Sequence, residues 1–360
     1  MKHRHLFAGN NTSEGFFSYY DQILPRGEAG RIFCIKGGPE AGKSTLMKMT
    51  AACLARRSVI IEYLHCPSDP ESLDGILIPA LNIALIDGDA VQESECIYRG
   101  AVDEIINLGE FWDRDGVARH KDHIISISEQ KEQFLLRAYR YLAAAKYLMD
   151  DALAMYAPAN GYGAYAEAEK IINAHINCIT KSAAPGKVRR MFASGITPLG
   201  IVSCIDTLIG EDYIVCAVES HWGAGVTELL SRISDAAVMH GLYVEQYCCP
   251  MDPANRIDHL VIPACRLALV SHGKYPDTGI NTDLVIDMAQ YASCVGTAEF
   301  AEREFDTLLR EALFTLNRAK AVQEQLEKYY IPYMNFAAVS DKTEQVIQQI
   351  EAVCDVAVLA

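Results

Sequence analysis

A glycine-rich segment with one lysine is the part of the sequence best suited to chemistry. Residues 37–45 read GGPEAGKST and fit the pattern G-x-x-x-x-G-K-[ST]. Glycines let a backbone fold round a phosphate so that several N–H groups point inward, and a helix that begins there adds its positive end. We therefore expect the segment to bind ATP or another NTP through Gly37, Gly38, Pro39, Glu40, Ala41, Gly42, Lys43, Ser44 and Thr45.

The pattern assigns separate roles to the charged and polar residues. The Lys43 ammonium is expected to reach the β- and γ-phosphates as a catalytic group, and the Ser44 hydroxyl to ligate Mg²⁺. Asp87 ends the apolar run IALID, where an NTPase places the carboxylate that accompanies Mg²⁺; the alternative is an ordinary strand-to-loop Asp. Glu40 departs from the usual loop, because a carboxylate beside a triphosphate repels it unless it points outward.

No pattern identifies the general base or the residue that positions an attacking water. The candidates are Asp69, which we assign as catalytic, Asp74 and Glu104. Asp69 and Asp74 belong to CPSDPESLD, and the alternative is that its Cys, Pro and Asp residues are turn-formers and helix N-caps. His65, at the tip of the preceding strand, is a weaker candidate.

A predicted helix at 128–155 carries further positive charge. Arg137 and Arg140 fit either a helical lid that contacts a transferring phosphate or an ordinary solvated face. The acidic pair Asp103–Glu104 is expected at the start of a helix.

Alternating strands and helices must position these residues. Apolar runs predict strands at 31–36, 58–66 and 82–87, and a helix is expected from Ser44 to about Ala55. This alternation is typical of a parallel sheet covered by helices, so the predicted fold class is α/β. From about residue 117 to 155, apolar residues recur at three- and four-residue steps, which predicts a helical subdomain.

The sequence is an internal duplication. The segment FAGNNTSEGFFSYYD from Phe7 matches FASGITPLGIVSCID from Phe192, and CPSDPESLDGILIPALNIALI from Cys66 matches CPMDPANRIDHLVIPACRLALV from Cys249. Later matches pair Ala138, Leu142, Ala145 and Lys146 with Ala312, Leu316, Ala319 and Lys320. We predict two tandem P-loop NTPase-like domains, residues 1–183 and 184–360, each a mainly parallel sheet flanked by helices with a helical subdomain.

The second copy lacks the charged groups of the first. Its loop reads ESHWGAGVTEL, in which Val226 stands opposite Lys43, and Ser271 stands opposite Asp87. The loss of both the phosphate lysine and the metal carboxylate predicts a degenerate domain with a structural, assembly or regulatory role. Its backbone amides leave weak nucleotide binding open.

Composition restricts the partners. The formal net charge of −15 disfavours broad nucleic-acid binding. No apolar run is long enough for a membrane helix and the N-terminus has no signal-like apolar segment, so we expect a cytoplasmic protein with no membrane partner. The twelve cysteines are dispersed, and those in apolar runs, such as Cys34, Cys216 and Cys265, are expected to be reduced. A partner protein or a homo-oligomer stays open.

The motifs together resemble a bacterial family of tandem P-loop proteins that is described as ATPase-like or nucleotide-binding. The resemblance rests on GGPEAGKSTLMK, HCPSDPESLDGILIPAL, GAVDEIINLGEFWD and RAYRYLAAAK, and covers nearly the whole chain. It implies a duplicated P-loop fold. The chain departs from the family at Val226 and at DGDAVQES, where the family has a DGTAPH-like run.

The resemblance and the loop together predict a Mg-dependent NTP-binding protein that hydrolyses ATP at the first copy. The alternatives are a small-molecule or nucleotide kinase, which shares GGPxxGKST-type loops, and a nucleotide sensor without turnover.

Overall fold

The computed structural model describes residues 3–90, 98–156, 162–272, 279–292 and 298–359. The chain forms two compact units, and each unit is assembled from separate segments of the sequence. Unit 1 takes its residues from Met1–Ala8, Tyr19–Leu136 and Thr315–Ala360, and unit 2 from Gly9–Ser18 and Arg137–Phe314. The boundary between the two copies, after residue 183, is therefore not the boundary between the two units, because each unit combines residues of both copies.

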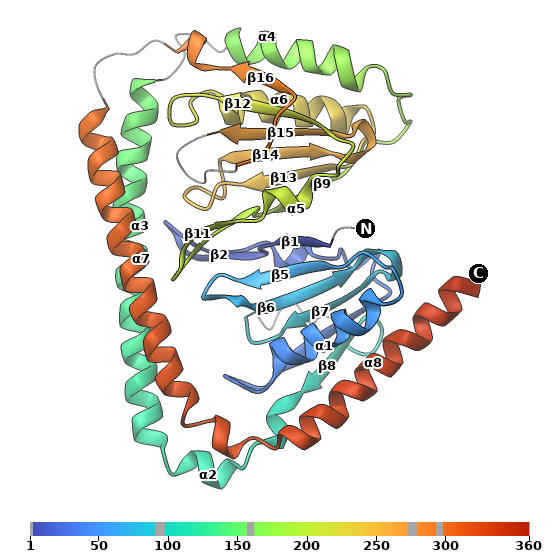
Figure 1. Cartoon of the computed structure of the whole chain (residues 1–360), viewed down its shortest axis with the longest axis vertical. Helices are drawn as coiled ribbons and strands as arrows, with labels where there is room; N and C mark the ends of the chain where they lie inside the picture. The colour runs from blue at the N-terminus through green and yellow to red at the C-terminus, as the bar shows by residue number, and fades with distance from the viewer. Residues whose placement is uncertain (1–2, 91–97, 157–161, 273–278, 293–297, 360) are drawn as a thin grey trace. The chain divides into compact units, whose positions relative to one another are not determined.

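Unit 1 is built on a six-stranded mixed sheet with the strand order β1-β5-β6-β7-β4-β8 (Figure 1). The strands are β1 (Arg4–Leu6), β4 (Arg31–Lys36), β5 (Glu62–Cys66), β6 (Asp69–Ile78), β7 (Ile83–Asp87) and β8 (Asp103–Asn107). The strand predicted at 31–36 is confirmed as β4. Those predicted at 58–66 and 82–87 are confirmed as β5 and β7 with shorter bounds.

The expected mainly parallel sheet is not confirmed, because β6 runs antiparallel to both β5 and β7. The alternative of turn-formers and helix N-caps is wrong for Asp69, Pro70 and Asp74, which lie in this strand. Residues 73–78 are all buried, so the strand shows no apolar–polar alternation in its sequence. The helix start expected at Asp103–Glu104 is also wrong, since these residues begin β8 beside β4.

Helices cover the sheet of unit 1. α1 (Lys43–Ala55) follows β4 as predicted, and α8 (Phe336–Leu359) lies beside it (Figure 1). Leu46 of α1 and Val346 of α8 share one apolar core with Leu85 of the sheet. Other helical elements of unit 1 are η1 (Tyr20–Gln22), η2 (Pro79–Leu81), η4 (Leu108–Phe111), α2 (Arg114–Ala118) and η8 (Ile331–Tyr333), with parts of α3 (Lys121–Met155) and α7 (Glu299–Glu327).

Unit 2 repeats the sheet of unit 1. Its strand order, β9-β13-β14-β15-β12-β16, has the same succession of parallel and antiparallel neighbours. These strands are β9 (Val188–Met191), β12 (Ile214–Glu219), β13 (Val244–Cys248), β14 (Ile257–Ile262), β15 (Leu267–His272) and β16 (Leu284–Asp287). The duplication in the sequence is thus confirmed at the level of the sheets.

Unit 2 also contains one hairpin from each copy. They are β2 (Gly9–Thr12) with β3 (Gly15–Ser18), and β10 (Ser194–Thr197) with β11 (Gly200–Ser203). In each turn a threonine hydroxyl, of Thr12 or Thr197, donates to the carbonyl of the glycine three residues later at 2.7 Å. Those glycines have φ angles of 103° and 114°, which favour glycine, so the turn explains why both copies share these residues.

The last helix of the first copy lies in unit 2, and that of the second copy lies in unit 1. α4 (Tyr162–Ile171) lies beside α6 (Val226–Met239), where Ala168 and Leu229 share a core (Figure 1). α8, from the second copy, packs on α1 in unit 1. Unit 2 also contains η5 (Ile172–Ile176), α5 (Ile205–Leu208), η6 (Pro263–Cys265) and η7 (Ala289–Tyr291).

The cysteines agree only in part with the expectation of reduced thiols. Cys216 and Cys265 are free, as predicted. Cys34 in β4 is disulfide-bonded, so the expectation is wrong at this position. Among the described residues, none of the helices combines the length and the apolarity needed to span a bilayer.

Candidate functional site

A tight glycine-rich loop joins the end of β4 to the start of α1. Three of its residues have positive φ angles, at 76° for Gly38, 53° for Glu40 and 87° for Gly42. Gly42 is the N-cap of α1, so the unpaired amides of the first helical turn lie at this loop. A Cβ on Gly37 would lie 2.6 Å from the Cβ of Ala41, which leaves no room for a side chain there.

The donors of the loop converge on one carboxylate oxygen, Oδ2 of Asp89. The N–H of Gly38 donates to it at 2.8 Å and that of Gly37 at 3.3 Å. Nζ of Lys43 donates to the same oxygen. Asp89 follows β7 in a turn where its own N–H donates to Oδ1 of Asp87 at 2.8 Å. The loop therefore has the donor arrangement of an anion-binding site.

Lys43 is held between two carboxylates. Its Nζ lies 3.0 Å from Oδ1 of Asp87 and also pairs with Asp89. Burial by itself would lower the pKa of Lys43, but Asp87 and Asp89 outweigh it and raise that pKa. Burial by itself would raise the pKa of Asp89, but Lys43 and the loop amides hold it below its ordinary value. Both groups are therefore charged at neutral pH.

The structure brings the two predicted metal ligands to the same end of the sheet. Asp87 pairs in register with Ile35 of β4, two residues before the loop, and Ser44 is the second residue of α1. Oγ of Ser44 accepts a 3.0 Å hydrogen bond from the N–H of Leu73 in β6. This bond leaves a second lone pair on the hydroxyl oxygen for another partner.

Asp74 lies beside the contact between Leu73 and Ser44 and is 5% exposed. Its Oδ2 accepts a 2.9 Å hydrogen bond from the hydroxyl of Tyr20. Burial, and then the charge of Asp87, raises the pKa of Asp74 to about 6.

The contact between Asp74 and Cys66 recurs in unit 2. There, Cys249 lies against Asp258, the equivalent pair of the second copy. Because the second copy lacks the lysine, this recurrence favours the structural alternative for the pair.

Asp69 and His65 are bonded to partners outside the loop. Nζ of Lys320 lies 2.7 Å from Oδ1 of Asp69, and the Ser72 hydroxyl donates to Oδ2 at 2.7 Å. Nδ1 of His65 bonds the carbonyl of Pro70 at 2.7 Å, and its Nε2 lies 2.9 Å from Nδ1 of His5. Burial lowers the pKa of His65. Both side chains are therefore bonded to groups other than the loop donors.

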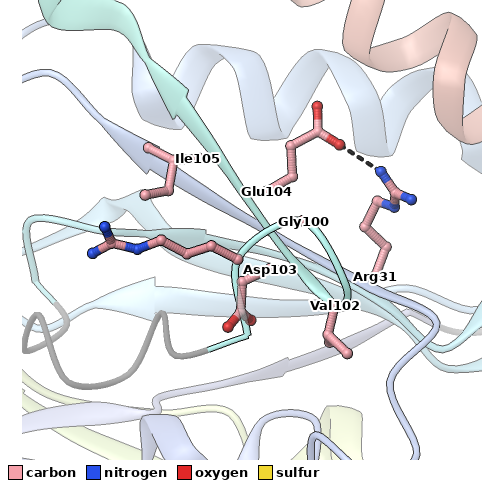
Figure 2. Close-up of a pocket in the computed structure, with 7 residues that line it drawn as sticks. Arg31, Gly100, Val102, Asp103, Glu104 and Ile105 are labelled. Carbon is pink, nitrogen blue, oxygen red and sulfur yellow. Dashed lines mark hydrogen bonds and ion pairs between the residues drawn. The ribbon is translucent and has the colours of Figure 1, made fainter.

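Glu104 of β8 stands opposite Phe33 of β4, and its partner Arg31 lies at the end of β4 opposite the loop. It pairs with Arg31 at 2.7 Å, and both residues line a surface pocket of about 320 Å³ (Figure 2). Arg31 is the first residue of β4, whereas the loop follows Lys36, the last. A six-residue strand spans about 20 Å, so this pocket is separate from the glycine-rich loop.

Three further predicted residues, Arg137, Arg140 and Glu40, are exposed. Arg137 and Arg140 are exposed residues of α3 within unit 2, and Arg137 donates to the hydroxyl of Tyr141 at 2.9 Å. These features favour the solvated-face alternative. Glu40 is exposed, and burial followed by the charge of Glu40 raises the pKa of Glu327 in α7. The loop donors bind Asp89 rather than Glu40.

The equivalent loop of unit 2 keeps the backbone turn without the charges. Gly225 caps α6 with a φ of 77°, and Gly223, which stands opposite Glu40, has a φ of 79°. Val226, at the position of Lys43, is 2% exposed and packs in the core of unit 2. Ser271, at the position of Asp87, donates its N–H to Nδ1 of His259.

The loop residues of unit 1 fit a polyphosphate with Mg²⁺. The convergence of three donors on one carboxylate oxygen suits a phosphate oxygen equally, because it accepts the same bonds. Ser44 and Asp87 offer the hydroxyl and carboxylate oxygens that Mg²⁺ prefers. No group of three His, Cys, Asp or Glu in the described residues could hold a metal unaided. Mg²⁺ in NTP sites takes most of its ligands from water and phosphate.

Two residues at the loop were missed by sequence reasoning. Asp89 belongs to DGDAVQES, whose departure from the family run is visible in the sequence, but no pattern places its carboxylate in the loop. Residues 91–94 of that run lie outside the described residues. Trp112 donates from Nε1 to the carbonyl of Gly37 at 2.7 Å, and its ring packs against Tyr330. No local signal predicts a contact across 75 residues of sequence.

Compared with known proteins, the chain matches no family model, and no curated protein or solved structure matches it at a significant level.

Proposed function

We propose that the chain binds a nucleoside triphosphate with Mg²⁺ at the glycine-rich loop of unit 1 and hydrolyses it, as a P-loop NTPase. The observation that carries the proposal is the convergence of Gly37 N–H, Gly38 N–H and Lys43 Nζ on a single anionic oxygen. These donors lie at a helix N-terminus, with Asp87 within 3.0 Å of Lys43. That set matches what a β- or γ-phosphate requires.

The protein's own groups have defined tasks in this proposal. Lys43 and the loop amides hold the phosphate oxygens and stabilise the negative charge that grows on them during phosphoryl transfer. Ser44 and Asp87 hold the Mg²⁺, which supplies further positive charge to the same oxygens. Trp112 fixes the carbonyl of Gly37 and so keeps the N–H groups of the loop pointed at the anion.

A sensor with slow or no turnover is the second candidate, and the bonding of the three proposed bases favours it. Asp69 is bonded to Lys320 and Ser72, Asp74 to Tyr20, and Glu104 to Arg31. A carboxylate that is already bonded must give up a partner before it can orient an attacking water.

Calorimetry with Mg-ATP, Mg-GTP and the two diphosphates tests the proposal, combined with a phosphate-release assay. We expect one nucleotide per chain, because Val226 and Ser271 replace the charged groups in unit 2. Lys43→Ala should abolish binding, whereas Lys48→Ala, an exposed lysine of the same helix, should leave it unchanged. Unchanged binding by Lys43→Ala would refute the site. Binding without phosphate release would exclude the hydrolase.

A further inference from the structure

We propose that Asp89 is a built-in competitor, an intramolecular anion that occupies the phosphate position of the loop and that an incoming phosphate must displace. The proposal deepens the function proposed above and rests on it for the identity of the ligand as a nucleotide. The displacement itself applies to any ligand that brings a phosphate group to this loop.

The contacts of Asp89 are those of a bound phosphate oxygen. Its Oδ2 accepts from the N–H of Gly38 at 2.8 Å, from the N–H of Gly37 at 3.3 Å and from Lys43. An ordinary lysine–carboxylate ion pair involves no backbone amides of the loop. The pair of Lys43 with Asp87 is of this ordinary kind, because it joins only Nζ to the carboxylate. Asp89 therefore uses the anion-binding donors of the loop themselves.

The chain holds Asp89 in place through the turn that follows β7. The N–H of Gly88 donates to the carbonyl of Ile35 at 2.7 Å, and that of Asp89 donates to Oδ1 of Asp87 at 2.8 Å. This local bonding orders the turn before any ligand arrives. A carboxylate held by an ordered turn competes for the loop donors at little entropic cost, because it does not lose the translational freedom that a separate anion loses on binding.

The same oxygen cannot share its position with a ligand phosphate. Two anions on one set of donors repel each other at contact distance, so one must leave. The Asp89 side chain is 37% exposed, which gives the displaced carboxylate a solvated position. The cost of displacement is thus the loss of charge-assisted hydrogen bonds in a partly solvated site, a cost that lowers ligand affinity without blocking binding.

Three variants of the full chain separate competition from charge and from folding. Asp89→Asn removes the competing charge and keeps the side-chain size. Asp89→Ser, whose side chain is too short to contact the loop donors, is the second variant in case the first folds poorly. Glu110→Gln removes one negative charge from η4, beside Gly109, at an exposed residue outside the loop. The probes are Mg-ATP and inorganic pyrophosphate, each titrated by calorimetry.

We expect Asp89→Asn and Asp89→Ser to bind both probes about tenfold more tightly than the natural chain, and Glu110→Gln to bind them unchanged. Equal affinities for the natural chain and both Asp89 variants would overturn the competitor, while the nucleotide site would stand. Tighter pyrophosphate binding with no ATP binding by any variant would support the competitor and refute the nucleotide function. No binding of either probe by any variant would overturn both.

Discussion

Lys320 lies 2.7 Å from Oδ1 of Asp69, and the two residues come from different copies of the duplicated sequence. The equivalent residues in unit 2 are Lys146 of the first copy and Asp252 of the second, and they pair at 3.3 Å. Each unit thus combines a helical lysine of one copy with a carboxylate from the sheet region of the other. The duplicated sequence builds two similar units by exchanging its helices.

The pair of Lys320 and Asp69 predicts a structural rather than a catalytic effect. Asp69→Asn and Lys320→Ala should each lower the melting temperature slightly, and a double-mutant cycle should give a coupling of about 0.5 kcal/mol, because both side chains are partly exposed. Phosphate release by Asp69→Asn should stay within about twofold of the natural chain, less than the loss on removing a general base. A much larger loss at unchanged stability would restore Asp69 as the base.

Introducing a lysine into unit 2 should not create a second nucleotide site. Val226 is 2% exposed within an apolar core, so Val226→Lys buries an ammonium group without a partner and should destabilise unit 2 by several kcal/mol. Ser271 also still lacks a carboxylate. Calorimetry should report one nucleotide per chain, and thermal unfolding should show the destabilisation. Val226→Ala, which adds no charge, is the control, and a stoichiometry of two would contradict the prediction.

Trp112 should tune the affinity of the loop. Trp112→Phe keeps an aromatic ring against Tyr330 but removes the Nε1–H that bonds the carbonyl of Gly37. A net hydrogen bond contributes about 1 kcal/mol, so Mg-ATP should bind about fivefold more weakly. Tyr330→Phe retains the ring packing and should bind normally. Equal affinities for Trp112→Phe and the natural chain would exclude a role for this bond.

Unit 2 should lose stability as the pH falls, because of His259. Burial, with a smaller contribution from His272, lowers the pKa of His259 to about 3. The unfolded chain takes up a proton near pH 6.5 and the folded chain does not, so stability is complete above that pH and declines below it. At pH 5 the loss from this residue alone is about 2 kcal/mol.

Denaturant unfolding between pH 5 and pH 8 measures this effect. His259→Gln, which cannot take up the proton, should reduce the loss of unfolding free energy at low pH. His123→Gln, at an exposed residue, should leave the pH dependence of stability unchanged. An identical decline in His259→Gln would show that the buried histidine does not cause it.

Local sequence was sufficient for β4, for α1 and for the loop that joins them. The apolar run at 31–36, the glycines that follow it and the helix to Ala55 appear in the structure as β4, the loop and α1. These features depend on residues that are close in sequence, because the conformational freedom of glycine and the periodicity of apolar side chains are properties of short segments. The duplication was visible for the same reason, because both copies repeat the turn residues and apolar positions of one fold.

Contacts between distant residues were decided only by the tertiary structure. Residues 73–78 of β6 are all buried and show no alternation, so the antiparallel position of the strand between β5 and β7 has no local signature. Asp89 reaches the loop across 46 residues to Lys43, and Lys320 reaches Asp69 across 251. A polar side chain has many partners available in an unfolded chain, and only the packed sheets and exchanged helices select the one that it binds.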